Sequence, residues 1–154
     1  MTDPDSLADF LDRHSVVGID SSPFIYYVEE HPKYLSVASA IFDATDQHVI
    51  SAVTSTISML EILVKPLRER NALLAHTIYS LATRHPHLTW IPPDLSVAGR
   101  GAKLRAHYNL RTADAIQIAT ALESGATGFV TNDRRLSRVT ELDVLVLDDL
   151  LHRR

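Results

Sequence analysis

The chain has 154 residues, of which 45% are hydrophobic and 22% are charged, and this size and composition predict one globular domain over residues 1–154. The absence of cysteine excludes disulfide bridges, thiolate zinc sites and cysteine nucleophiles. Fifteen basic and nineteen acidic residues leave a net charge of −4, which is the wrong sign for a protein that binds nucleic acid through its overall charge.

The amino terminus and the apolar segments bear on where the protein acts. No stretch approaches the roughly 18 uninterrupted apolar residues of a membrane span. The first fifteen residues, MTDPDSLADFLDRHS, are acidic, whereas a secretion signal would begin with basic residues followed by an apolar core. We therefore expect a cytoplasmic protein with no membrane segment, and we treat residues 1–15 as an N-terminal extension of unknown role.

Short β-branched runs alternate along the chain with longer helical patterns. A strand at 16–20 is followed by a helix that begins at Ser21 and a second helix at 34–44. A strand at 48–53 precedes a helix capped within 54–56 that runs to about residue 64, and an amphipathic helix at 67–82 follows Pro66. Next come a strand at 88–91, a helix from about 92 to 107, a helix from Thr112 to Gly125, and strands at 128–131 and 143–147. This alternation predicts an α/β fold, a three-layer α/β/α sandwich with a central parallel sheet of four to five strands.

Two aspartates follow predicted strands. Asp20 is the last residue of the first strand, and Asp133 lies two residues after Thr131 at the end of the fourth. In open parallel sheets, ligands bind outside the carboxyl ends of the strands, so the two carboxylates share one crevice if these strands are neighbours. Taken singly, either aspartate is also explained as a turn former or a helix cap.

Two further acids lie on predicted helices beside apolar residues. Glu61 has Ile57 and Val64 as helical neighbours, and a carboxylate on or beside a buried face is costly unless it is paired or bound to a cation. Asp114 falls in the first turn of its helix, where the helix dipole alone favours a negative charge. Its position next to the apolar stripe of that helix places it near the edge of the core.

Hydrolysis of a phosphodiester gives a reason to gather four acids that repel one another. Divalent cations neutralise the carboxylates, activate a water molecule and offset charge on the reacting oxygens. Mg²⁺ and Mn²⁺ prefer oxygen ligands, which are the ligands that this cysteine-free chain offers.

Four segments resemble the PIN domains, and among them the toxin components of VapBC-type toxin–antitoxin systems. In chain order they are GIDSSPFIYY, SMLEILVKPLRERN, LRTADAIQIATAL and GFVTNDRRL, and together they span nearly the whole sequence. The resemblance implies a PIN-like nuclease domain that cleaves RNA with Mg²⁺ or Mn²⁺. It also implies a homodimer and a small cognate antitoxin protein that covers the site. The acidic extension at 1–15 departs from the typical compact toxin.

The resemblance also assigns roles to individual residues. Asp20, Glu61, Asp114 and Asp133 are implied to be both catalytic and metal-binding. Ser21, Ser22 and Thr131 are expected to hold water or phosphate beside them, although helix capping competes for both serines. Clustered basic residues are expected to contact the RNA backbone, although solvated helix faces also explain such clusters; they are Lys65, Arg68, Arg134, Arg135 and Arg138.

Two other classes of function remain open. One is a catalytically silent PIN-like module that binds RNA or a protein, against which the complete set of four acids argues. The other is a phosphotransfer domain of similar α/β build. A receiver would require an acidic pair before the aspartate that ends the first strand, and VVGID has none. An aspartyl-phosphate phosphatase would require Asp-x-Asp after the first strand, whereas Asp20 is followed by two serines.

Overall fold

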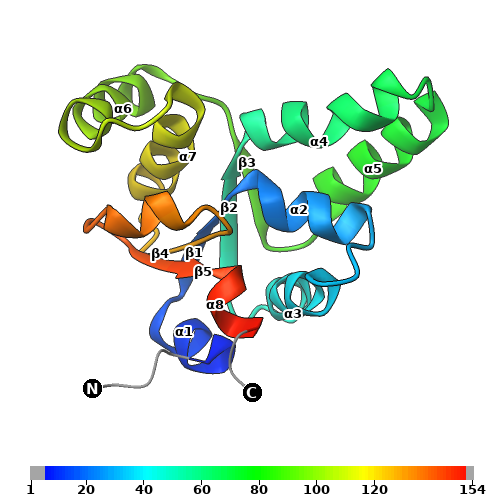
Figure 1. Cartoon of the computed structure of the whole chain (residues 1–154), viewed down its shortest axis with the longest axis horizontal. Helices are drawn as coiled ribbons and strands as arrows, with labels where there is room; N and C mark the ends of the chain where they lie inside the picture. Colours follow the sequence, from blue (N-terminus) through cyan, green and yellow to red (C-terminus); the bar gives the residue numbers. More distant parts are fainter. Residues whose placement is uncertain (1–5, 152–154) are drawn as a thin grey trace.

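A computed structural model describes residues 6–151 of the chain and shows a five-stranded parallel sheet between layers of helices (Figure 1). The strand order is β3-β2-β1-β4-β5. The first and fourth strands are therefore neighbours, and Ile19 lies beside Val130. The three-layer α/β/α prediction is confirmed. The strands are β1 Val16–Ile19, β2 Ser51–Ser55, β3 Leu88–Ile91, β4 Gly128–Thr131 and β5 Asp143–Val146.

The helices fill the connections between the strands, as parallel pairing requires. Most of their bounds agree with the sequence patterns to within a few residues, and Gly125, with a positive φ of 79°, follows the end of α7 as expected. The helices are α1 Leu7–Arg13, α2 Ser21–Val28, α3 Leu35–Asp46, α4 Thr56–Arg68, α5 Ala72–Arg84, α6 Leu95–Tyr108, α7 Thr112–Glu123, the 3₁₀ helix η1 Arg134–Arg138 and α8 Leu147–Leu151.

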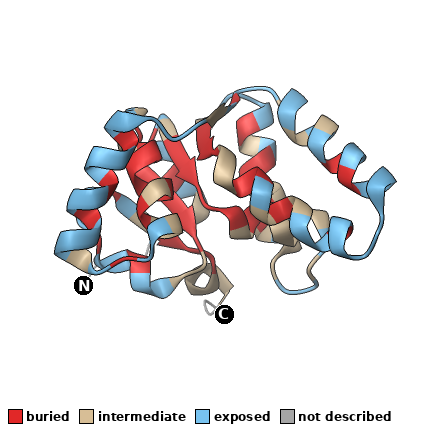
Figure 2. Ribbon diagram, turned by 90° about the horizontal axis from the view of Figure 1, so that it is seen from above, coloured by how far each residue is buried: buried red, intermediate tan, exposed pale blue. Residues whose placement is uncertain are grey.

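The two faces of the sheet carry separate apolar cores, because successive residues of a strand point to opposite faces. In β4, Val130 belongs to the core under α2 and α3, whereas Phe129 belongs to the core under α6 and α7. Seen from above, the sheet and the inward helix faces are buried and the outer helix faces are exposed (Figure 2). Both layers of helices are thus held by hydrophobic burial against one sheet.

Local interactions explain two boundaries that differ from the sequence-based predictions. The second strand begins at Ser51 and not at residue 48, because Val49 and Ile50 donate backbone hydrogen bonds to Ala44 and complete the end of α3. Helix α4 continues through Pro66 to Arg68, since a proline in the last turn removes only one backbone hydrogen bond.

Caps differ as well. The N-cap of α2 is Asp20, whose carboxylate accepts from the Ser21 amide, and the N-cap of α7 is Arg111 where Thr112 was expected.

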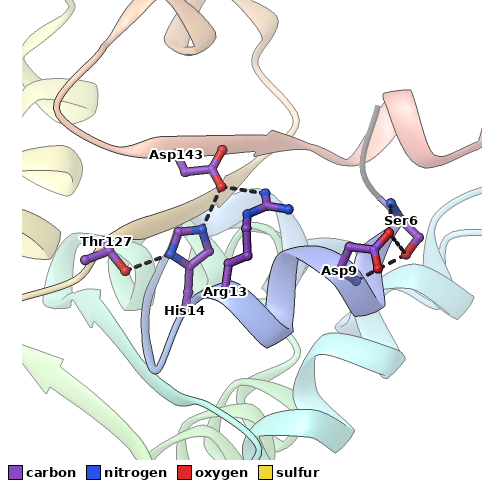
Figure 3. A network of polar contacts seen from close by, with 6 residues as sticks. All are labelled: Ser6, Asp9, Arg13, His14, Thr127 and Asp143. Atoms are coloured by element: carbon purple, nitrogen blue, oxygen red, sulfur yellow. Dashed lines mark hydrogen bonds and ion pairs between the residues drawn. The ribbon is translucent and has the colours of Figure 1, made fainter. Parts of the chain in front are cut away.

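Helix α1 gives part of the acidic extension a structural role. Its last residue, Arg13, and His14 both bond Asp143 at the start of β5, at 2.7 and 2.6 Å (Figure 3). The other ring nitrogen of the buried His14 lies 2.7 Å from the Thr127 hydroxyl oxygen. Partial burial acts to raise the pKa of Asp143, but the hydrogen bonds from Arg13 and His14 hold it below its usual value. These contacts hold α1 at the amino-terminal ends of β4 and β5.

Two glycines allow close packing on the sheet. A Cβ at Gly18 in β1 would lie 2.5 Å from the Ala121 Cβ of α7 and 2.8 Å from the ring of Phe129. A Cβ at Gly128 in β4 would lie 2.7 Å from the ring of Phe10 in α1. Any side chain at either position would force the helix away from the sheet.

Among residues 6–151, no helix combines the length and the apolar character needed to cross a lipid bilayer.

Candidate functional site

Asp20 is a buried carboxylate at the carboxyl end of the central strand. Its side chain is 9% exposed and accepts hydrogen bonds from the Ser21 amide at 2.8 Å and the Thr131 hydroxyl at 2.7 Å. Burial raises its pKa to about 6; those two hydrogen bonds oppose the change, and the negative charges of Asp114 and Glu61 add to it. Within the described chain, none of the ion pairs found involves Asp20.

Glu61 approaches Asp20 from helix α4 through a serine. The Ser21 hydroxyl at the start of α2 donates to the Glu61 carboxylate at 2.5 Å. Glu61 is partly buried, beside Ile62 on the inner face of α4, whereas its neighbour Leu60 is 64% exposed. The sequence thus placed Glu61 correctly beside a buried face, although Val64, which was predicted to share that face, is 38% exposed.

Asp114 lies in the first turn of α7 and is partly buried. Its pKa is raised, first by desolvation and next by the negative charge of Asp133. The positive charges of Arg135 and Arg111 act in the opposite direction. Since Glu61 also contributes to the rise, Asp114 is within electrostatic range of acids from α4 and from the end of β4.

Asp133 caps η1 and is the one of the four acids that forms an ion pair within the part of the chain that the structure describes. Arg135 donates to it from Nε at 3.0 Å and from Nη2 at 2.6 Å, and the Arg135 amide also donates to it at 3.0 Å. These bonds lower the pKa of Asp133. The buried Thr131 connects this residue to Asp20, because its hydroxyl accepts from the Asp133 amide at 3.0 Å while donating to the Asp20 carboxylate.

A buried polar network beneath the site was missed by the sequence reasoning. The Thr54 hydroxyl donates to the carbonyl of Ile19 at 2.7 Å and lies 2.7 Å from the Ser58 hydroxyl. Gln117 of α7 donates to that Ser58 hydroxyl at 2.7 Å and accepts from the Ser55 amide at 3.3 Å. The network therefore joins β1, which ends directly before Asp20, and β2 to the helices α4 and α7, which carry Glu61 and Asp114. A glutamine between two isoleucines, in AIQIA, was the signal available in the sequence.

The four acids meet at one end of the sheet and sense one another's charge, but they do not form a ready-made ligand cage. Among residues 6–151, no three acidic or histidine side chains are grouped closely enough to hold a metal ion. The donor set itself suits a hard cation, because it consists of carboxylates with hydroxyl groups beside them. Mutual repulsion and the burial of Asp20 also suit a cation, since positive charge would relieve both.

The predicted helper and basic residues divide into those near the acids and those elsewhere. Ser21 and Thr131 contact the acids, whereas the buried Ser22 hydroxyl has no hydrogen-bond partner within the described residues. Arg134 pairs with Asp149 at 2.7 Å, and Lys65 pairs with Glu29 at 3.3 Å. Arg68 and Arg138 are exposed on α4 and η1. Of the five predicted basic residues, Arg135 is the one whose contacts reach the acids; Arg111, outside that set, acts on Asp114 and Asp133 through its charge.

Solved structures of low sequence identity share the fold. VapBC2 from Rickettsia felis, bound to a DNA fragment from its promoter, matches with a TM-score of 0.66 and 13% identity over 85% of this chain and 98% of that chain. A toxin–antitoxin complex from Klebsiella pneumoniae matches with a TM-score of 0.64 and 18% identity, covering 86% and 98%. DNA-bound VapBC from Salmonella typhimurium matches with a TM-score of 0.62 and 17% identity, also covering 86% and 98%.

Two further comparisons concern the sequence itself. The search of curated proteins finds no match. The family model of the PIN domain matches residues 17–142, a range that includes all four acids, all but the first residue of the central strand, and the network beneath the site. Because this match covers most of the chain, the protein belongs to the PIN domain family.

Proposed function

We propose that this protein is a metal-dependent endoribonuclease, the toxin of a type II toxin–antitoxin pair. The observation that carries the proposal is the convergence of four acids at the carboxyl ends of β1 and β4, where Asp20 is buried and has no cationic partner among residues 6–151. Membership of the PIN domain family supports nuclease activity, and the likeness to toxin–antitoxin complexes supports the biological setting.

Asp20, Glu61, Asp114 and Asp133 would hold Mg²⁺ or Mn²⁺ through their carboxylate oxygens. When bound, the cation supplies positive charge that activates water for attack on the phosphodiester and stabilises the reacting oxygens. We propose RNA as the substrate and products with a 5′-phosphate and a 3′-hydroxyl, as the family resemblance implies.

The polar neighbours of the acids set their orientation. Ser21 holds Glu61, and Thr131 holds Asp20 while anchoring the Asp133 amide, so three acids are fixed by hydroxyl groups. Arg135 and Arg111 bring positive charge to the same end of the sheet, where a phosphate backbone would approach. Affinity for RNA would then come from local basic groups and not from the net charge of −4.

A small antitoxin and a second copy of the chain are the proposed partners, and the cytoplasm is the proposed location. An antitoxin would best insert an arginine or lysine among the acids, because a cationic side chain can replace the charge of the metal. Exposed leucines on α4 and α5 support association with a second copy, because such apolar surface is costly in water; they include Leu60, Leu67 and Leu81, at 64%, 55% and 68% exposure.

The test is RNA cleavage by wild type, Asp114→Asn and Asp149→Asn with Mn²⁺ or EDTA. Asp114→Asn should lose at least about 100-fold in rate, as expected when a group that stabilises charge in the reaction is removed. Asp149→Asn, which removes the partner of Arg134, should cleave within about threefold of wild type, since it breaks only an exposed ion pair. Circular dichroism should show all three folded.

The remaining outcomes are equally decisive. Equal cleavage by Asp114→Asn and wild type would reject the assignment of the acids. RNA binding by wild type without cleavage in Mg²⁺ or Mn²⁺ would instead favour a silent binding module.

A further inference from the structure

Asp133 is the exception among the four acids, because within residues 6–151 it is the one that forms an ion pair, with Arg135. Arg135 contacts both of its carboxylate oxygens, with Nε on Oδ1 and Nη2 on Oδ2, and the Arg135 amide adds a third bond. A two-point contact between guanidinium and carboxylate is the strongest geometry that such a pair adopts. Oxygens directed at a guanidinium are not directed at a shared cation, which agrees with the lack of a ready ligand group within residues 6–151.

The Arg135–Asp133 ion pair can separate without a change in the fold. The side chain of Arg135 is 57% exposed and that of Asp133 is 27% exposed, so water can solvate both partners after they separate. The two residues are only two positions apart at the start of η1, so the guanidinium can leave the carboxylate by rotation of its own side chain. No movement of a helix or strand is required.

The charge of Arg135 also reaches a second acid. Its positive charge lowers the pKa of Asp114, against the effect of Asp133, and Asp114 in turn acts on Arg135. In the absence of a cation, Arg135 therefore offsets the repulsion between acids from α7 and from the end of β4. A divalent ion placed among the acids would make this compensation unnecessary and would repel the guanidinium.

From these contacts we propose that Arg135 is a positioning residue that holds Asp133 in the metal-free protein and releases it when a divalent cation binds. The inference rests on the metal site proposed above. After release, the guanidinium remains within one side-chain length of the acids and faces solvent. There its planar fork fits a phosphate group as well as it fits a carboxylate, so Arg135 changes partner from Asp133 to the substrate.

Calorimetric titration with MnCl₂ at constant ionic strength tests the proposal on wild type, Arg135→Gln, Arg135→Lys and Arg134→Gln. Arg135→Gln should bind Mn²⁺ about twofold to fivefold more tightly, the range expected when a competing exposed ion pair is removed. Arg134→Gln removes the same charge one residue away, from a pair with Asp149, and should bind Mn²⁺ as wild type does. Arg135→Lys keeps the charge without the fork and should fall between wild type and Arg135→Gln.

A second measurement separates competition from a merely structural role. With RNA as substrate, Arg135→Gln should need less Mn²⁺ for half-maximal rate and should show a higher KM for RNA, because the released guanidinium no longer binds phosphate. Both changes reversed, or both absent, would contradict the proposal.

The outcomes distinguish the inference from the function on which it rests. If wild type binds Mn²⁺ and Arg135→Gln binds it with the same affinity, the inference is wrong and the metal site stands. The inference is also wrong if Arg134→Gln tightens binding as much, since net charge alone would then explain the effect. If no form binds Mn²⁺, the metal site is overturned and the inference with it.

Discussion

Replacing Asp20 by asparagine should stabilise the metal-free protein at neutral pH while abolishing cleavage. The pKa of Asp20 is about 6 in the folded chain, against 3.8 for an unperturbed aspartate. A difference of one pKa unit between the folded and unfolded states corresponds to about 1.4 kcal/mol. Above pH 6, keeping the Asp20 carboxylate ionised therefore lowers the free energy of unfolding by about 3 kcal/mol. An asparagine avoids that cost.

Part of this gain is lost through hydrogen bonding. The carboxylate accepts from both the Ser21 amide and the Thr131 hydroxyl, whereas the amide of asparagine has one acceptor oxygen. Losing one hydrogen bond to a charged group costs about 1.5 to 3 kcal/mol. The expected net gain at pH 7.5 is therefore about 1 kcal/mol, or roughly 2 to 4 °C in Tm for a domain of this size.

The dependence on pH fixes the sign. The folded wild type binds more protons than the unfolded chain between about pH 3.8 and 6, so its free energy of unfolding falls as pH rises through this window. The asparagine variant lacks this contribution. The stability of the variant relative to wild type should therefore increase from pH 4 to about pH 6.5 and then level off, and at pH 4 the variant should be the less stable protein.

Urea unfolding in EDTA between pH 4 and 8 measures this difference. Asp12→Asn, on the exposed face of α1, is the matched control and should stay within about 0.5 kcal/mol of wild type. Added Mn²⁺ should stabilise wild type but not Asp20→Asn, because only the former retains the site. A variant that is less stable than wild type at pH 7.5, or a difference that does not change with pH, would refute the reasoning.

Two further substitutions test the packing that positions the site. Gln117→Leu should lower the free energy of unfolding by about 1 to 3 kcal/mol, because the Ser58 hydroxyl and the Ser55 amide lose a buried partner. The same variant should cleave RNA more slowly. Denaturant unfolding and an RNA cleavage assay measure the two effects, and an unchanged cleavage rate would contradict the second. Gly128→Ala should destabilise by about 1 to 3 kcal/mol, since its Cβ would lie 2.7 Å from the ring of Phe10; thermal melts check this, and an unchanged Tm would show that α1 is free to shift.

The sequence predicted the order of strands and helices because the spacing of apolar residues differs between the two kinds of element. Alternating β-branched runs and amphipathic helices predicted all five strands. The shared crevice for Asp20 and Asp133 was conditional on the first and fourth strands being neighbours, and the structure meets that condition. What failed were the boundaries decided by single hydrogen bonds. The turn at His48, with a φ of 58°, ends α3 and delays β2, and no apolar pattern records such a turn.

Within the candidate site, the sequence singled out the four acids together with Ser21 and Thr131, but not the buried network or the Arg135 pair. The residues that carry charge stand out in a sequence because burial of a charge needs a reason. By contrast, Thr54 and Ser58 look unremarkable and Gln117 stands out only as a glutamine between isoleucines, since their role depends on side chains of β2, α4 and α7 meeting in the folded chain. The sequence did not reveal the pairing of Arg135 with Asp133 either, because an arginine two residues from an acid is also common on solvated turns where no such pair forms.

Because Gly18 has no side chain, helix α7 can pack closely on the central strand, and this packing affects the spacing of the acids. Gly18 is two residues before Asp20, and the contact that it permits with Ala121 sets how closely α7 approaches the central strand. Asp114 is on the same helix, about two turns earlier. The gap between the two carboxylates is therefore governed by an apolar contact outside the polar cluster. Exchanging small residues at Gly18 or Ala121 should therefore change the spacing of the acids while every polar group of the site is retained.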